Sequence, residues 1–481
     1  MFKVKRLTRW LSGVLIVLLQ GCSDNSAQAL IDIKEQVNAG GIASVGYQPF
    51  ARFDLPAPTL TNENKSLFYA GRALAHQPWV KAPTSTTARD GLGPIFNARS
   101  CLGCHLSGGR GRMPEDESDA LFTAFVRLSV PGNNLHTGVT PEPSYGDQLQ
   151  TQSVGLFSQL GLTIPAGELA PEADVRVRWH YEKIRLADGG VVERRRPELL
   201  ITQLSDGPLH PESLTSLRNA PGMFGMGLIA AIPQADIDGL ADPLDANNDG
   251  ISGRRNQVWN PVTQTTEPGR FGWKANRPDL PTIIASAFAG DIGISNPLFP
   301  SQPCSSIQVS CQQQPNGNNK DGFELPHDLL ELTVNFVRDT AVPKARVNEH
   351  HIEGRDAFMS VGCQHCHQPS FTTQKMVGLP HLSEQKIWPY SDFLLHDMGE
   401  ELADDRTDFL ASGREWRTAP LWGIGLQRKV AQRLSLLHDG RARSVEEAIL
   451  WHGGEAQSAK EKYMALPQVL RRELVIFVEA L

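Results

Sequence analysis

The chain has 481 residues, of which 40% are hydrophobic and 21% are charged, which is ordinary for a soluble globular protein. Its length suggests roughly two to four domains and permits a large core. The formal net charge of −7 argues against a general nucleic-acid binder, so we expect no nucleic-acid partner.

Residues 1–21 have the features of an export signal and not of a folded element. Basic residues precede the apolar run Leu11–Leu19, which is too short to span a bilayer as a permanent helix. Leu19-Gln20-Gly21-Cys22 is similar to a bacterial lipobox, which predicts cleavage before Cys22 and a lipid on this cysteine. The alternative is an ordinary signal peptide that is cut nearby. Residues 22–60 are predicted to form a tether.

The export signal sets the expected compartment. We predict a periplasm-facing protein of a Gram-negative bacterium, anchored to the cell membrane or the outer membrane. Only the N-terminal lipid is expected to contact the membrane.

The first folded elements are expected to lead to a cofactor site. Leu67–Ala75 is predicted to be a helix, and Ile95–Cys104 is predicted to be a helix whose end carries two cysteines. Cys101-Leu102-Gly103-Cys104-His105 has the C-x-x-C-H pattern of c-type haem attachment. Two cysteines one turn apart can add to the two vinyl groups of one porphyrin, and the next histidine binds the iron.

Residues 120–205 read as a β-rich insertion in an otherwise helical protein. Three segments alternate or run apolar between turn signals, as strands do: Ala124–Val130, Val175–His180 and Glu198–Leu204. Later, Arg218–Leu228 resembles Arg417–Leu426, which suggests a duplicated unit.

Asp245-Ala246-Asn247-Asn248-Asp249-Gly250 follows the opening of an EF-hand-like loop. The position that should hold the bidentate glutamate is Asn256. We expect a bound Ca²⁺ with Asp245, Asn247 and Asp249 as ligands; a turn rich in aspartate and asparagine is the alternative.

Cys304 and Cys311 lie seven residues apart in a polar stretch. In an exported chain this pair predicts a small disulfide that closes a loop, with two free thiols as the alternative.

Cys363-Gln364-His365-Cys366-His367 repeats the haem pattern roughly 260 residues after the first copy. A redox dithiol or half of a zinc site remains the alternative for either copy, but zinc needs its ligand pairs at short loop spacing. We therefore predict two covalent haems c, with His105 and His367 as the proximal ligands.

Met398 is the first candidate for a sixth ligand, on the second haem, because it lies in a polar turn where a packing methionine is less expected. His396 and His438 are rivals, and a core methionine is the alternative. For the first haem Met223 and Met226 are available, and neither is singled out.

The last two elements are expected to be helices. Ser444 followed by Glu447 predicts a capping box, and Pro467–Leu481 has apolar residues at helical spacing. The fold class is predicted to be mainly α, with two cytochrome c-like haem domains, 61–340 and 341–481. A long insertion with some β structure belongs to the first.

Residues 60–481 resemble the bacterial di-haem oxidoreductases described as thiol oxidoreductases or peroxidases. These are distant relatives of di-haem cytochrome c peroxidases and of the di-haem enzyme of methylamine utilisation. The resemblance rests on these segments: Cys101–His105, Gly109–Gly111, Tyr145–Gln150, Gly225–Leu228, Asp242–Gly253, Phe271–Ala275, Cys363–His367, His396–Gly399 and Leu437–Arg441. It implies that His367 and Met398 hold an electron-entry haem and that His105 holds the reactive one.

We therefore expect a di-haem oxidoreductase, peroxidase-like, that takes electrons at the C-terminal haem and reacts at the N-terminal haem. The expected partners are a small redox protein or a quinone-linked electron donor, and a small substrate such as peroxide. The alternatives are a pure electron-transfer cytochrome with two six-coordinate haems and a haem-bearing binding or sensing subunit.

No catalytic residue can be assigned from the sequence. Glu142, His136 and Gln148 are candidates for moving a proton at the first haem. Trp273 is a candidate electron relay between the haems, and a core tryptophan is the alternative.

Overall fold

The computed structural model describes residues 32–46, 52–85, 89–161, 163 and 168–481. The predicted signal segment and Cys22 lie outside the described residues. Within this part of the chain, no helix has the length and apolar character that crossing a bilayer requires.

The expectation of a mainly α fold is wrong. Helices make up 31% of the protein and strands 19%, and this balance does not by itself establish two cytochrome c-like domains. The strands of the described part lie in small sheets of two or three strands. Most of these strands have only two to four residues, which is too short for an alternating pattern to show in the sequence.

One helical pair lies in the first half of the fold. Helix α2 (Asn62–His76) packs against α9 (His327–Arg338), and α7 (Leu280–Asp291) lies beside α9. The backbones approach closely at Gly71, where an added Cβ would lie 1.9 Å from the carbonyl oxygen of Leu332. The helix expected around Leu67–Ala75 is confirmed.

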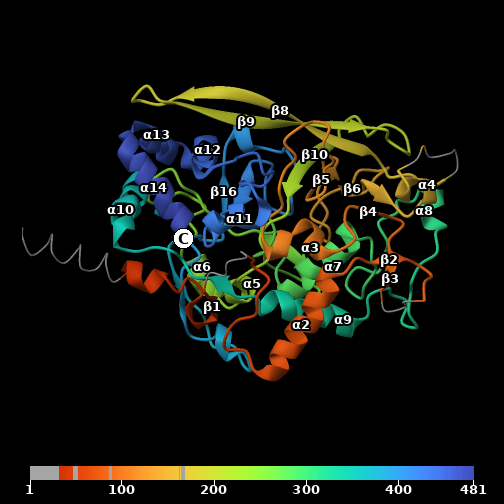
Figure 1. Cartoon of the computed structure of the whole chain (residues 1–481). Coiled ribbons are helices and arrows are strands. Elements are labelled where there is room, and N and C mark those ends of the chain that lie inside the picture. Colours follow the sequence, from red (N-terminus) through yellow and green to blue (C-terminus); the bar gives the residue numbers. More distant parts are fainter. Residues whose placement is uncertain (1–31, 47–51, 86–88, 162, 164–167) are drawn as a thin grey trace, which may run out of the picture.

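A second pair repeats this arrangement near the C-terminus. Helix α10 (Ile352–Val361) packs against α14 (Gln468–Ala480). An added Cβ on Gly354 would lie 2.2 Å from the carbonyl oxygen of Glu473. The C-terminal helix was thus predicted correctly. The two pairs lie in different parts of the molecule (Figure 1).

The predicted strands of the insertion are confirmed. Strand β5 (Ala124–Ser129) lies between β10 (Leu214–Asn219) and β6 (Gln148–Leu149). Strands β8 (Asp174–Arg185) and β9 (Val191–Thr202) form a long antiparallel hairpin in which Asp174 pairs with Thr202.

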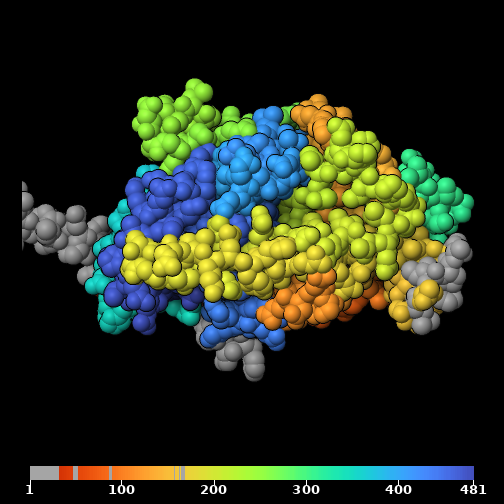
Figure 2. Space-filling view, turned by 90° about the horizontal axis from the view of Figure 1, so that it is seen from above, coloured from red at the N-terminus to blue at the C-terminus, as the bar shows by residue number. Residues whose placement is uncertain are grey.

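The hairpin crosses from one half of the protein to the other. Near its middle, Trp179 Nε1 donates to the carbonyl of Pro114 at 3.0 Å. Two residue pairs nearer the tip, the Arg195 amide donates to Glu447 at 2.8 Å, on helix α12 (Val445–Trp451). At the turn, Asp188 pairs with Arg471 of α14 at 2.9 Å. Figure 2 shows the hairpin as a continuous band across this face of the molecule. The hairpin therefore ties the C-terminal helices to the insertion.

One local prediction is corrected. The helix expected over Ile95–Cys104 is only α3 (Cys101–Cys104), because residues 95–96 form strand β4 (Ile95–Phe96). The described part of the expected tether contributes Ile33 and Phe53 to the core, at 1% and 2% exposure. Burial of apolar side chains accounts for this docking.

The other elements are short. The remaining α-helices are α4 (Leu156–Gln159), α5 (Met226–Ala230), α6 (Gln234–Asp238), α8 (Val309–Gln312), α11 (Gln427–Ala431) and α13 (Gln457–Ala465). The remaining strands are β1 (Ser44–Val45), β2 (Val80–Lys81), β3 (Asp90–Leu92), β7 (Gln152–Ser153), β11 (Gln257–Asn260), β12 (Thr265–Pro268), β13 (Val342–Pro343), β14 (Phe371–Thr372), β15 (Lys386–Ile387), β16 (Leu395–Asp397) and β17 (Glu415–Arg417). The 3-10 helices are η1 (Gly41–Ala43), η2 (Leu106–Gly108), η3 (Glu349–His351), η4 (Cys363–His365), η5 (Pro380–Leu382), η6 (Glu400–Leu402), η7 (Ile424–Leu426) and η8 (Gly454–Ala456).

Candidate functional site

The first cysteine pair lies on a single helical turn. Cys101 and Cys104 bound α3, and the His105 amide donates to the Cys101 carbonyl at 2.9 Å. The imidazole Nδ1 of His105 lies 2.6 Å from the carbonyl oxygen of Pro221. Because a carbonyl only accepts, Nδ1 carries the proton and a neutral ring keeps its lone pair on Nε2, as a metal ligand must.

The second pair repeats this geometry. The His367 amide donates to the Cys363 carbonyl at 2.9 Å, and His367 Nδ1 lies 2.9 Å from the carbonyl oxygen of Tyr390. Burial lowers the pKa of His367 to about 4 and also lowers the pKa of His105. Both rings are therefore neutral at pH 7 with a free Nε2.

The thiol environment argues against a redox dithiol. Burial raises the pKa of Cys101, Cys104 and Cys363 to about 12, and it also raises the pKa of Cys366. A reactive dithiol needs a thiolate, which such surroundings disfavour. An uncharged thioether bond to haem fits these surroundings.

A cavity of about 330 Å³ adjoins the second pair, within the range of roughly 300–1,000 Å³ for ligand pockets. Most of its lining side chains are apolar, and α10, α12 and α14 contribute some of them. The histidines and the methionine that line it are His365, His367, His396, Met398, His438 and His452.

Two arginines give this cavity a cradle for anions. Arg110 Nη2 donates to the carbonyl of Leu437 at 2.6 Å, and Arg417 Nε donates to the carbonyl of Gly272 at 2.8 Å. Burial lowers the pKa of both guanidinium groups to about 10, and no carboxylate of the described residues forms an ion pair with either. Buried cations need a counter-charge, so the carboxylates of a haem would fit here.

His396 is a poor iron ligand because both ring nitrogens are occupied. Nε2 lies 2.8 Å from Asp392 and Nδ1 lies 2.6 Å from Glu455. Although burial opposes protonation, these carboxylates hold the pKa of His396 well above its usual value. His396, Asp392 and Cys366 are the metal-capable group found among the described residues, but a protonated imidazole does not bind a metal.

His438 is held by stacking. Its ring lies parallel to Trp416, with centroids 3.6 Å apart, and its Nε2 lies 3.9 Å from Asp439. Met398 lies in the turn after β16 and lines the cavity, as the sequence suggested. His452, which the sequence did not suggest, lines the same cavity.

The first pair has a different polar neighbour. Asp291 ends α7, and its charge adds to the effect of burial in raising the pKa of Cys101 and Cys104. Gln148 Nε2 donates to Asp291 Oδ1 at 2.9 Å, while the buried Gln148 Oε1 has no partner. Of the three proton-transfer candidates, Gln148 is the one that the structure brings to Asp291.

The other candidates near the first pair have structural partners. Glu142 accepts hydrogen bonds from three amides, those of Ser144, Tyr145 and His210, and so holds a turn. His136 packs against Trp259, with ring centroids 4.5 Å apart. Met223 and Met226 are part-buried against the main core, and neither is singled out as a ligand.

The predicted calcium loop lies at the second cavity and not at the first pair. Asp249 lines this cavity, and the loop's polar oxygens accept from backbone amides of the loop itself. Asp245, Asn247 and Asp249 thus form a turn with internal bonds. Binding of Ca²⁺ here stays a prediction.

Trp273 connects the two sites. Its indole lines the second cavity, and Nε1 donates to the carbonyl of Asn219 at 2.9 Å. Asn219 lies two residues before Pro221, and the carbonyl oxygen of Pro221 contacts Nδ1 of His105. Arg110 also lies over the indole, 4.9 Å from its centroid.

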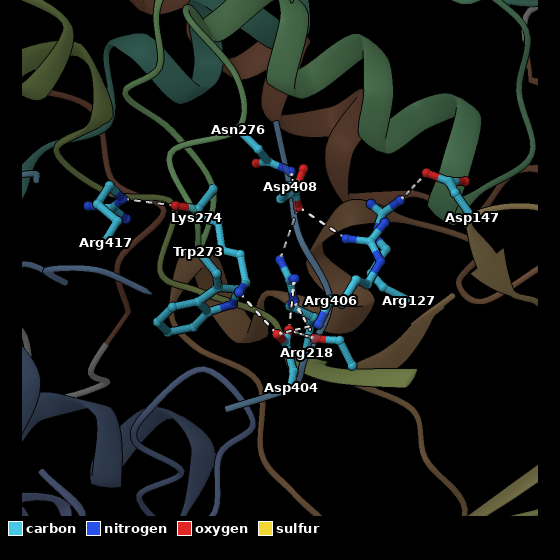
Figure 3. Close-up of polar contacts among 12 residues, drawn as sticks. Arg127, Asp147, Arg218, Trp273, Lys274, Asn276, Asp404, Arg406, Asp408 and Arg417 are labelled. Atoms are coloured by element: carbon cyan, nitrogen blue, oxygen red, sulfur yellow. Dashed lines mark hydrogen bonds and ion pairs between the residues drawn. The ribbon is translucent and has the colours of Figure 1, made fainter. Parts of the chain in front are cut away.

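Buried ion pairs join the segments around Trp273 (Figure 3). Asp404 lies 3.0 Å from Lys274 and 3.2 Å from Arg218, while Asp408 lies 3.2 Å from Arg406. Removing one partner of such a buried pair typically costs about 3–5 kcal/mol. Elsewhere, Cys304 and Cys311 form a disulfide.

The comparisons with known proteins give one match. A family model described as "Di-haem oxidoreductase, putative peroxidase" matches residues 35–481. Neither the curated proteins nor the solved structures contain a match.

Proposed function

The chain belongs to the di-haem oxidoreductase family, and from this premise we propose that it is a peroxidase-like enzyme with two covalently attached c-type haems. The observation that carries the proposal is the repeated ligand geometry. His105 and His367 each follow a part-buried cysteine pair and each donate Nδ1–H to a backbone carbonyl. This orients two Nε2 lone pairs, one for each haem.

When bound, haem supplies one-electron chemistry and, where one axial position is open, a site for peroxide. One molecule of hydrogen peroxide takes up two electrons and two protons and gives two molecules of water. The electrons come from a small redox protein or a quinone-linked donor, enter on the His367 side and reach peroxide on the His105 side.

The chain's own residues serve this reaction in three ways. Arg110 and Arg417 neutralise the carboxylates of the second haem. Asp291, supported by Gln148, moves a proton near the first haem, as peroxide cleavage requires. Trp273 passes electrons between the two sites.

Met398 and His452 line the second cavity, and either could supply a second ligand to a haem held by His367. On the His105 side neither Met223 nor Met226 is singled out as a second ligand, so a haem held there would leave one position for peroxide. This inequality is what separates an enzyme from a pure electron-transfer cytochrome.

The proposed location follows from the sequence. The mature chain is anchored by a lipid on Cys22 to the cell membrane or outer membrane of a Gram-negative bacterium and faces the periplasm. Asp245, Asn247 and Asp249 hold Ca²⁺ beside the second cavity.

Rapid mixing tests the proposal. The fully reduced full-length protein is mixed with hydrogen peroxide, and oxidation of each haem is followed by absorbance. We expect both haems to be oxidised with a rate proportional to peroxide concentration. Oxidation no faster than in peroxide-free buffer would favour the electron-transfer cytochrome.

A further inference from the structure

His452 shares one hydrogen-bond arrangement with the two histidines that follow the cysteine pairs. Its Nδ1 lies 2.7 Å from the carbonyl oxygen of Ala448. Among the described residues, only His105, His367 and His452 direct Nδ1 at a backbone carbonyl. In all three the carbonyl fixes the tautomer and leaves Nε2 free to bind a metal.

The helix before His452 directs it into the second cavity. Val445, Ala448 and Ile449 of α12 line that cavity together with His452, which is the spacing of one helical face. Burial lowers the pKa of His452, so its ring is neutral at pH 7. His367 and His452 line the same cavity.

Contacts from the β8–β9 hairpin hold the end of α12. Arg194 Nη1 donates to the carbonyl of Leu450 at 2.9 Å, and its guanidinium lies 3.9 Å from the ring centroid of Trp451. The Ser444 side chain accepts from the Glu447 amide and caps the helix start. A metal ligand needs such support, because its position must be held to within roughly 0.5 Å.

The other candidate ligands of the second haem are not oriented for iron binding in this way. His396 has carboxylates on both nitrogens, and His438 is stacked on Trp416. Met398 has a flexible, unbranched side chain and no hydrogen bond that could orient its sulfur.

We propose that His452 is the second axial ligand of the haem held by His367, and that Met398 lines the pocket without binding iron. This inference rests on the proposed function, because it requires haem at Cys363 and Cys366. A haem with two histidine ligands has a lower reduction potential than one with histidine and methionine, since a methionine ligand raises the potential.

The test compares two full-length variants, His452→Ala and the matched control Met398→Leu. Electron paramagnetic resonance of the oxidised proteins reports the spin state of each haem. We expect His452→Ala to convert the low-spin signal of the second haem to high-spin, and added imidazole to restore it. Met398→Leu should leave the low-spin signal unchanged. The reverse pattern would overturn the inference.

A second readout needs no variant. Near-infrared magnetic circular dichroism of the unmodified oxidised protein distinguishes methionine ligation from ligation by two histidines. A methionine-type band would overturn the inference. Mass spectrometry separates the two failures: a chain without covalent haem contradicts the proposed function, whereas two haems and an unaltered His452→Ala signal contradict only the role of His452.

Discussion

At the scale of the residue, the orientation of imidazole rings carries most of the information about the site. The sequence singles out His105 and His367 because haem attachment uses a contiguous pattern. It does not single out His452, because the free Nε2 of this ring depends on a bond to Ala448 and on the cavity that α12 faces. The spacing of Val445, Ala448, Ile449 and His452 on one helical face was the available signal.

Replacing Asp291 by asparagine tests the proton-transfer role. The amide cannot exchange a proton, so we expect the rate of reaction with peroxide to fall by about 10²–10⁴-fold. Stopped-flow absorbance of the reduced protein measures this rate.

Asp147→Asn is the matched control, because Asp147 is half-exposed, pairs with Arg127 and adjoins Gln148. It should react at nearly the rate of the unmodified protein. Equal rates for the Asp291 and Asp147 variants would remove Asp291 from the mechanism.

Glu172 makes stability depend on pH. Burial raises the pKa of this carboxyl to about 8, although the Gln308 side chain and the Gln150 amide donate to it. The folded state therefore holds a proton that the unfolded state releases above about pH 4.5. The stabilisation is fully present below that pH and is lost as the pH rises through about 8.

Denaturant unfolding at several pH values measures this effect. Between about pH 5 and 8 we expect the free energy of unfolding of the unmodified protein to fall by roughly 2–4 kcal/mol. The free energy of unfolding of Glu172→Gln should not show this fall. Glu212→Gln, at an exposed position, should follow the unmodified protein. Parallel pH curves for the Glu172 variant and the unmodified protein would refute this assignment.

At the scale of the element, two helix pairs, α2 with α9 and α10 with α14, pack in the same way. Gly71 and Gly354 each allow a helix to meet a partner backbone, and an aromatic pair lies beside each crossing: Phe68 with Phe336 and Phe358 with Phe477. Long helices such as α2 and α14 could be predicted from apolar spacing. The two-residue strands could not, since each exists only because a distant segment pairs with it.

Gly354→Ala tests the close approach of α10 and α14. The added Cβ would lie 2.2 Å from a backbone oxygen, so the helices must move apart. We expect a loss of about 1–3 kcal/mol in the free energy of unfolding, measured with denaturant. Gly46→Ala, where an added Cβ meets nothing within 4 Å, should lose much less. Equal losses in the free energy of unfolding for the two variants would show that the close contact between α10 and α14 does not contribute to stability.

At the scale of the whole molecule, the two C-x-x-C-H motifs have unequal surroundings. The second has a cavity, two arginines that pair with no carboxylate of the described residues, and two candidate ligands, whereas the first has Asp291 and Gln148 beside its cysteines. The hairpin and the buried pairs around Asp404 and Asp408 join the parts that carry these sites. Contacts between segments so far apart in the chain leave no local pattern, which is why the sequence predicted the sites but not their arrangement.

Inequality of the two haems is the central claim, and electron paramagnetic resonance of the oxidised full-length protein tests it most directly. The account predicts two ferric signals in equal amounts, one low-spin from the haem at His367 and one high-spin from the haem at His105. Two low-spin signals, both unchanged by a small ligand such as fluoride, would contradict it.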